Sequence, residues 1–322
     1  MYILFFTVFL FILLIVKKNK IKKSKRNILS NRNYLKYFNE KDLKLRNCDN
    51  VNHCENVYFN GKKNLFYDEK IMLKKIVNDI NILLNNKFSE IFANIKFIKV
   101  KDHIENSLPH TRNEYIVLSQ LWFNNFMNKF KHDNNFILND EYSRRLIFHE
   151  QFHIFQRYNL KKMIILYKKY WNLIQLNKEL PKILIDINRT NPDALPKITN
   201  NWLFYDNLNN TYILPMCIYN TELENNNLDI TDTVNIFIKV KKVGNEFIFE
   251  NLNEQLRQKN LLINNKSYTN FFGNNSNNNY HPNEISASLF ESIVDNEIGF
   301  KNANFFPAIN KMKHFFRDYD LL

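Results

Sequence analysis

The segment His149-Glu150-Gln151-Phe152-His153 combines residue types and spacing that indicate a chemistry. On an α-helix, residues four apart lie on the same face, so the imidazoles of His149 and His153 can reach one ion. The H-E-x-x-H pattern is typical of a zinc site in which the glutamate acts on a water molecule beside the ion. The segment therefore predicts Zn²⁺ as cofactor, His149 and His153 as its ligands, and Glu150 as a general base.

The surrounding residues favour a helix from Glu141 to Tyr158. This run contains no glycine or proline and carries apolar side chains at helical spacing, and Asp140 and Asn159 fit its two ends. A core helix that carries two histidines and a glutamate by chance is the alternative. It would bury the ionised Glu150 beside Phe148 and Phe152 without a partner, which is costly. The metal site is therefore the preferred interpretation.

A catalytic zinc site needs a third protein ligand and an open position. The best candidate is Glu284 in the segment Tyr280 to Ala287. Pro282 suits the first position of a helix, and Glu284 then falls in the first turn, where the helix dipole favours a carboxylate. Two alternatives remain: Glu284 only caps its helix, or His281 is the third ligand.

Residues near the proposed ligand are candidates for further roles in the site. The oxyanion that forms when a carbonyl is attacked needs a donor besides the metal. His281 and Tyr280 are the preferred donors because they adjoin Glu284, and the other candidates are His110, Arg157, Tyr158 and Arg189. Glu291 lies seven residues beyond Glu284 on the same helical face, so it can orient a ligand histidine; a solvated surface charge is the alternative.

At this point the chain resembles the gluzincin metallopeptidases, in which an H-E-x-x-H helix supplies two histidines and a later helix supplies a glutamate. The resemblance implies that His149, His153 and Glu284 bind zinc, that Glu150 is the general base and acid, and that the strand before the zinc helix, here 114–119, pairs with an extended substrate.

Three more fragments carry a second resemblance. Pro109-His110-Thr111, His153 to Arg157 and Asn191-Pro192-Asp193 are similar to segments of uncharacterised metallopeptidase-like proteins of large DNA viruses and algae.

The N-terminus predicts a membrane anchor. Residues 2–16 are uncharged and mostly apolar, and seven lysines and arginines follow within residues 17–26. A cleavable signal would place its positive charge first, so a retained anchor is favoured over an unusual cleaved signal. The positive-inside rule then places the remainder on the cytoplasmic side, with the lysines near anionic lipid headgroups. Because much of the net charge of +13 lies in this run and no nucleic-acid motif follows, no nucleic-acid partner is expected.

The three cysteines, Cys48, Cys54 and Cys217, are an odd number in a large chain, so no disulfide framework is expected and a reducing compartment fits. A small metal site at Cys48, His53 and Cys54 is a minor alternative.

The patterns predict an α+β fold. Residues 1–26 form the anchor and its basic run, 27–65 a stalk or irregular lead-in, and 66–322 a zincin-like metallopeptidase domain with a central H-E-x-x-H helix and a small sheet. We expect helices over 67–85, 121–130, 160–176, 282–296 and 310–316. We expect strands over 95–100, 114–119, 202–205, 211–219, 234–241 and 246–250, a hairpin turn at Gly244-Asn245 and a polar loop over 262–279.

These expectations together predict a membrane-anchored zinc peptidase, a single-pass protein that acts on a peptide or protein substrate with Glu150 as base. The alternative is a catalytically inactive zincin-like membrane protein with a structural or partner-binding role. The intact Glu150 favours the enzyme, because a purely structural zinc site does not require a base there.

Overall fold

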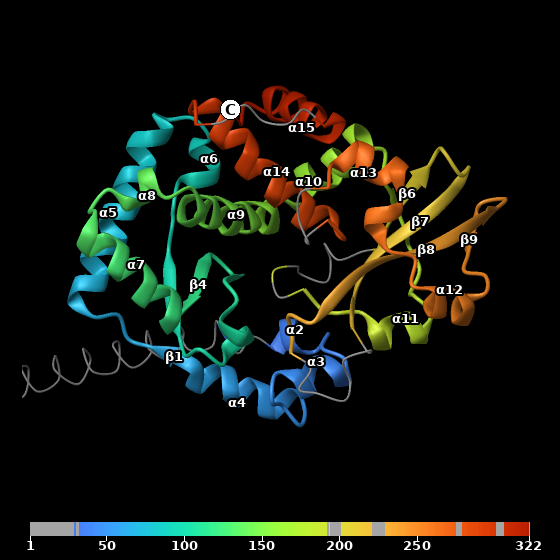
Figure 1. The fold of residues 1–322 in the computed structure, drawn as a ribbon, viewed down its shortest axis with the longest axis horizontal. Helices are drawn as coiled ribbons and strands as arrows, with labels where there is room; N and C mark the ends of the chain where they lie inside the picture. Colours follow the sequence, from blue (N-terminus) through green and yellow to red (C-terminus); the bar gives the residue numbers. More distant parts are fainter. Residues whose placement is uncertain are drawn as a thin grey trace, which may run out of the picture.

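The computed structural model describes residue 29 and residues 32–191, 193, 201–220, 229–274, 279–300 and 306–321. These residues form a mixed α+β fold with two sheets, where one small sheet was expected. In Figure 1 the two sheets lie on opposite sides of the molecule, with helices α9 (Glu141–Tyr158) and α14 (Pro282–Glu297) between them.

The first sheet has the strand order β1-β2-β4-β3. Its strands are β1 (Lys62–Lys63), β2 (Phe97–Val100), β3 (His110–Arg112) and β4 (Tyr115–Ser119). Strands β2 and β4 are parallel, whereas the other pairs are antiparallel. Helices α7 (Gln120–His132) and α9 contact this sheet, which gives the metal-site helix a rigid support.

Helix α5 (Tyr67–Leu84) illustrates how local sequence specifies an element. It buries Met72, Ile76, Ile80 and Leu84, which recur every four residues and so share one face. Asn85 ends the helix in the left-handed conformation, with a φ of 44°. The short helices α6 (Ser89–Phe92) and α8 (Phe136–Asn139) complete this side of the core.

The region before residue 66 is folded where it is described, so the prediction of an irregular lead-in is wrong there. It contains α2 (Arg32–Leu35), α3 (Glu40–Leu45) and α4 (Val51–Gly61). These helices pack against the first sheet through a separate apolar cluster that includes Tyr58 and Ile98. In the same region, Arg46 forms buried ion pairs with Asp42 at 3.2 Å and with Glu105 at 2.8 Å.

Cys48 and Cys54 form a disulfide, which corrects the expectation that the cysteines do not pair. The pairing removes the basis for a metal site with His53, and it also removes the cysteine argument for a reducing compartment. Cys217 is buried as a free thiol.

The second sheet has the order β5-β6-β7-β8-β9, and all of its pairs are antiparallel. Its strands are β5 (Ile174–Gln175), β6 (Trp202–Asp206), β7 (Thr211–Tyr219), β8 (Thr233–Val243) and β9 (Glu246–Ile248). Val243 pairs with Glu246 and Gly244 has a φ of 60°, so the predicted two-residue hairpin turn is confirmed.

Further helices pack around the second sheet and against α9 and α14. They are α10 (Leu160–Ile165), a π-helical turn (Leu166–Tyr170), α11 (Lys182–Ile187), α12 (Leu252–Gln258), α13 (Lys266–Phe272) and α15 (Pro307–Asp318). Two short 3₁₀ segments, Ile104–Ser107 and Leu262–Asn264, complete the list. The helix expected over 160–176 therefore stops short, because the chain turns into β5. The loop expected over 262–279 contains α13, which buries Tyr268 and Phe272.

No helix in the described part of the chain is both long enough and apolar enough to span a membrane. The longest described helices, α5 and α9, have 18 residues each, and both carry charged side chains. The predicted membrane-anchor helix, single-pass topology and cytoplasmic placement are therefore not supported and are withdrawn. Residues 1–26, on which they were based, lie outside the described residues.

Candidate metal centre

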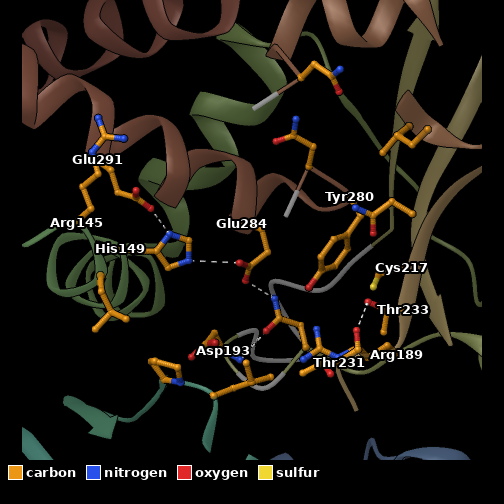
Figure 2. Close-up of a pocket in the computed structure, with 18 of the residues that line it drawn as sticks. Arg145, His149, Arg189, Asp193, Cys217, Thr231, Thr233, Tyr280, Glu284 and Glu291 are labelled. Atoms are coloured by element: carbon orange, nitrogen blue, oxygen red, sulfur yellow. Dashed lines mark hydrogen bonds and ion pairs between the residues drawn. The ribbon is translucent and has the colours of Figure 1, made fainter. Parts of the chain in front are cut away.

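Helices α9 and α14 bring the chemically active side chains together. Glu284, Glu291 and Asp295 are separated by seven and four residues, so they form one stripe along α14 that faces α9. Asp295 pairs with Arg145 at 2.5 Å near the start of α9, whereas Asn283 accepts a hydrogen bond from Gln156 at 2.8 Å near its end. The two helices therefore run in opposite directions, and His149 of α9 lies opposite Glu284 (Figure 2).

Apolar packing holds the two helices close to each other. The ring of Phe152 stacks on that of Phe290 with a centroid distance of 4.4 Å. Phe92 of α6 contacts both helices, since its ring lies 5.3 Å from that of Phe148 and 5.9 Å from that of Phe290. Ala287 is fully buried, and its small side chain allows the two helices to approach each other closely. The polar cluster is thus built on a rigid apolar support.

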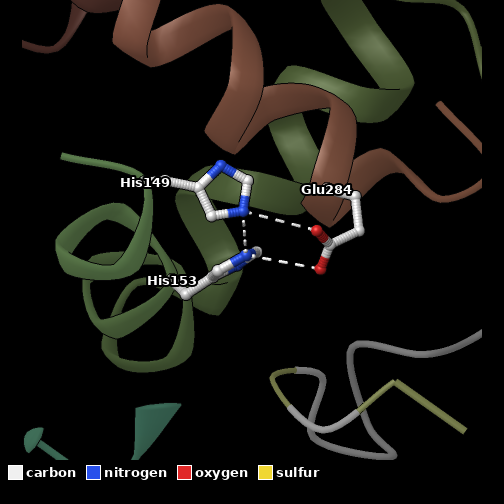
Figure 3. A group of neighbouring side chains, drawn as sticks. All are labelled: His149, His153 and Glu284. Atoms are coloured by element: carbon white, nitrogen blue, oxygen red, sulfur yellow. Dashed lines mark hydrogen bonds and ion pairs between the residues drawn. The ribbon is translucent and has the colours of Figure 1, made fainter. Parts of the chain in front are cut away.

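His149, His153 and Glu284 form a three-residue cluster whose donor atoms lie within 4.8 Å of one another. The Nε2 atoms of the two histidines are 3.0 Å apart, and they lie 3.4 Å (His149) and 3.3 Å (His153) from the two oxygens of Glu284 (Figure 3). A tetrahedral ion with bonds of about 2.0–2.1 Å separates its donors by about 3.3–3.4 Å. The two nitrogen–oxygen distances match this value and the nitrogen–nitrogen distance is slightly shorter, so the three side chains could hold one ion.

Further hydrogen bonds orient both imidazoles. His149 Nδ1 contacts Glu291 Oε1 at 2.6 Å, as the spacing of Glu291 predicted, and His153 Nδ1 contacts Gln156 Oε1 at 2.8 Å. Both oxygens are acceptors, so each Nδ1 carries the hydrogen and each Nε2 directs a lone pair at the other and at Glu284. With neutral imidazoles, such a convergence of lone pairs could hold a metal ion. Carboxylate and amide partners of this kind are common behind metal-bound histidines.

The pKa values of the three side chains also indicate a site that favours positive charge. Burial alone lowers the pKa of His149 and of His153, but Glu284, together with Glu291 for His149, raises both above their ordinary value. Burial raises the pKa of Glu284, but the two histidines lower it well below its ordinary value. Protons supply the positive charge in the absence of a metal, so an ion must displace them.

Glu150 is buried next to this cluster, and its Oε2 has no hydrogen-bond partner among the described residues. Burial, followed by repulsion from Asp193, raises its pKa to about 8. Unpartnered buried carboxylate oxygens are rare because they are costly, and they concentrate at functional sites. Glu150 therefore has both the position and the free oxygen that a general base requires.

The three sequence fragments of the second resemblance meet at this site. The side chain of Asn191 donates to Glu284 Oε1, and Asp193 accepts from the backbone and hydroxyl of Thr111. Arg157 donates to the Asp193 carbonyl oxygen at 3.0 Å and to the Thr111 hydroxyl at 2.6 Å. These hydrogen bonds hold Asn191 against Glu284 and Asp193 against strand β3.

The strand expected to pair with substrate is not an edge strand. Residues 115–119 form β4, which lies between β2 and β3, so that expectation is wrong. The edge strands of this sheet are β1 and β3, and on β3 the backbone N–H of Thr111 donates to Asp193. The described cavity next to the cluster lies in front of α9.

A cavity of about 1310 Å³ opens onto the cluster, and His149, Glu150 and Glu284 lie in its wall. Tyr280 also lines the cavity. His281 is not among its lining residues. It caps α14 by accepting a hydrogen bond from the Asn283 backbone at 3.2 Å, and burial lowers its pKa to about 4. Glu284, and not His281, therefore completes the cluster with the two histidines.

Sequence reasoning missed two residues that directly support the cluster. Gln156 orients His153, and Asn191 binds Glu284. Both belong to fragments that the second resemblance had marked, but no spacing rule assigns them a role, because their partners are distant in sequence.

No protein-family model, curated protein or solved structure matches this chain. The geometry of the site provides a buried cluster of two histidines and one glutamate that could hold a metal ion.

Proposed function

We propose that this chain is a zinc-dependent peptidase with Glu150 as its general base. The observation that carries the proposal is the buried Glu150 carboxylate, with one free oxygen, beside the His149–His153–Glu284 cluster in the wall of a large cavity. Metal ligands alone would also suit a structural site. A free carboxylate beside them and an open approach are features of a hydrolytic site.

The donor set favours zinc among the common divalent ions. Two imidazole nitrogens and one carboxylate at tetrahedral spacing suit Zn²⁺, whereas Ca²⁺ and Mg²⁺ prefer more numerous oxygen donors. When bound, zinc would acidify a coordinated water and polarise the carbonyl of the scissile bond.

The roles of the protein groups follow from their positions. His149, His153 and Glu284 hold the ion, while Glu291 and Gln156 keep the two imidazoles in the orientation that binding requires. Glu150 removes a proton from the attacking water with its free oxygen and delivers it to the nitrogen of the leaving amine. Tyr280, whose side chain lines the cavity, is the candidate donor to the developing oxyanion.

The experiment begins with the zinc content of the full chain, measured by mass spectrometry of the metal in the parent, Glu150→Gln and Glu284→Ala proteins. We expect one zinc per chain in the parent and in Glu150→Gln, and a strong loss in Glu284→Ala. The same proteins are then incubated with a mixed peptide library, and the products are identified by mass spectrometry. We expect Glu150→Gln to reduce cleavage about 10²- to 10⁴-fold.

Glu90→Gln is the matched control, because Glu90 is a surface residue paired with Lys162 at 2.8 Å. It should retain both zinc and cleavage. A parent protein without stoichiometric zinc would contradict the metal assignment. Full cleavage by Glu150→Gln would contradict the assigned base.

A further inference from the structure

Arg189 lies in the wall of the cavity, on the side away from His149. Its backbone N–H donates to the carbonyl oxygen of Cys217 on strand β7 at 2.9 Å, which fixes the residue against the second sheet. Figure 2 shows Glu284 between His149 and Tyr280, with Arg189 beyond Tyr280 and near Cys217. The guanidinium is thus displaced from the metal cluster but shares its cavity.

Arg189 differs from the other arginine of this cavity in its ionic partners. Arg145 is neutralised by Glu141 at 3.2 Å and Asp295 at 2.5 Å. No ion pair joins Arg189 to an acidic side chain in the described part of the chain, and its buried Nε has no hydrogen-bond partner there. Its near neighbours are instead Tyr280, Cys217, with which its side chain forms a hydrogen bond, and the cationic Arg46. No described residue therefore compensates its positive charge.

An uncompensated, largely desolvated guanidinium is costly, and its planar fork of donors matches a carboxylate. A carboxylate ligand would supply both the missing charge and the missing acceptor for Nε, with charge-assisted hydrogen bonds. Elsewhere the cavity is lined by acidic groups, among them Glu150, Glu284 and Asp193, which repel an anion. Arg189 is therefore the position in this cavity that favours a negative charge.

We infer that Arg189 binds a carboxylate of the substrate, so that the cavity accepts peptides with a negative charge on the Tyr280 side of the cluster. This inference rests on the proposed peptidase function. The carboxylate belongs either to the C-terminus of the peptide or to an aspartate or glutamate side chain, since both present the same group to the guanidinium.

The test uses the zinc-loaded full chain and a series of alkyl hydroxamates with arms of increasing length. Each compound is made in two forms, with the arm ending in a carboxylate or in a carboxamide, and its Kd is measured by calorimetry. The hydroxamate reports on the metal, and the ratio between the two forms reports on Arg189. At the best arm length we expect the carboxylate to bind about 10- to 100-fold more tightly, and Arg189→Met to abolish this preference.

Arg145→Met is the matched control, because it removes an arginine of the same cavity that already has acidic partners. It should preserve the preference. Equal binding of both forms at every arm length by the parent would overturn the inference while leaving the metal site intact. That comparison needs no variant, so it holds even if Arg189→Met does not fold. Failure of every hydroxamate to bind would instead indicate that the proposed metal site is wrong.

The source of the carboxylate is then determined with three matched N-acetylated peptides. They carry a free C-terminus, a C-terminal amide, or a C-terminal amide with one internal glutamate. Preference for the first identifies the terminal carboxylate, and preference for the third identifies a side chain. In either case Arg189→Met should remove the preference. Cleavage that is independent of all carboxylates would contradict the inference.

Discussion

The contact between Glu291 and His149 allows a prediction in which only one charge changes. In the parent, His149 Nδ1 lies 2.6 Å from Glu291 Oε1. Glu291→Gln preserves the size of the side chain and leaves an oxygen that can accept the hydrogen bond from this Nδ1. It removes the negative charge that stands behind the imidazole. The substitution therefore separates the charge of Glu291 from its role as a hydrogen-bond acceptor.

The expected magnitude follows from the exposure of the pair. Loss of a residue that orients a metal ligand commonly weakens metal binding about 10- to 100-fold. The Glu291 side chain is 18% exposed and that of His149 is 12% exposed, so water screens part of the interaction. We therefore expect a value near the lower limit, about 10-fold or about 1.4 kcal/mol, for Glu291→Gln.

The assay is competition for zinc between the protein and a fluorescent chelator at a fixed pH and salt concentration. Glu297→Gln is the matched control, since it makes the same change at the end of the same helix, and it should bind zinc as the parent does. A change of less than about twofold for Glu291→Gln would refute the argument that this carboxylate supports His149. A loss far beyond 100-fold would also refute it, because Glu291 would then be a direct ligand.

Three other predictions follow from the buried charges. Zinc affinity should fall as pH falls, and the loss should begin above pH 6.5, because the raised pKa values of His149 and His153 let protons compete with the metal. Competition with a chelator at several pH values measures the change in affinity. In the metal-free protein the pKa of Glu150 is raised from 4.5 to about 8, so the native state holds the extra proton and stability declines as pH rises between these values. Glu150→Gln should remove this contribution, on the order of a few kcal/mol, from the difference in unfolding free energy between pH 5 and pH 8. Thermal unfolding of both proteins at the two pH values measures this difference, and an unchanged difference would contradict the argument. Glu105→Gln should destabilise the fold by about 3–5 kcal/mol, because it leaves two buried arginines without their shared carboxylate; limited proteolysis should then cut first in the helices before residue 62.

Local patterns were sufficient for the elements that contain the site. The run from Glu141 to Tyr158 forms the predicted helix, and Pro282 and Glu284 occupy the first turn of the second. Both predictions depend on interactions between residues at most a few positions apart, namely the helical periodicity and the preferences of helix ends. The hairpin at Gly244 was predictable for the same reason, because the turn geometry demands a residue that tolerates a positive φ.

Predictions that relied on composition were less successful. The polar region before residue 66 contains packed helices, held by a disulfide and by buried ion pairs with Glu105. Its apolar residues are too widely spaced to show a clear period, and its stability comes from contacts with distant strands. The membrane assignment was likewise based on the composition of one short terminal run.

The sequence by itself determined that two histidines share a helical face with a glutamate between them, since helix geometry places residues i and i+4 together. Only the tertiary structure decided what meets that face. It brought Glu284 from about 130 residues away, added Gln156 and Asn191 as supports, and placed the uncompensated Arg189 in the same cavity. These partners are chosen by the packing of α14 on α9 and of the second sheet beside them. Such long-range contacts follow from the burial of many apolar side chains at once, which leaves no short pattern in the chain.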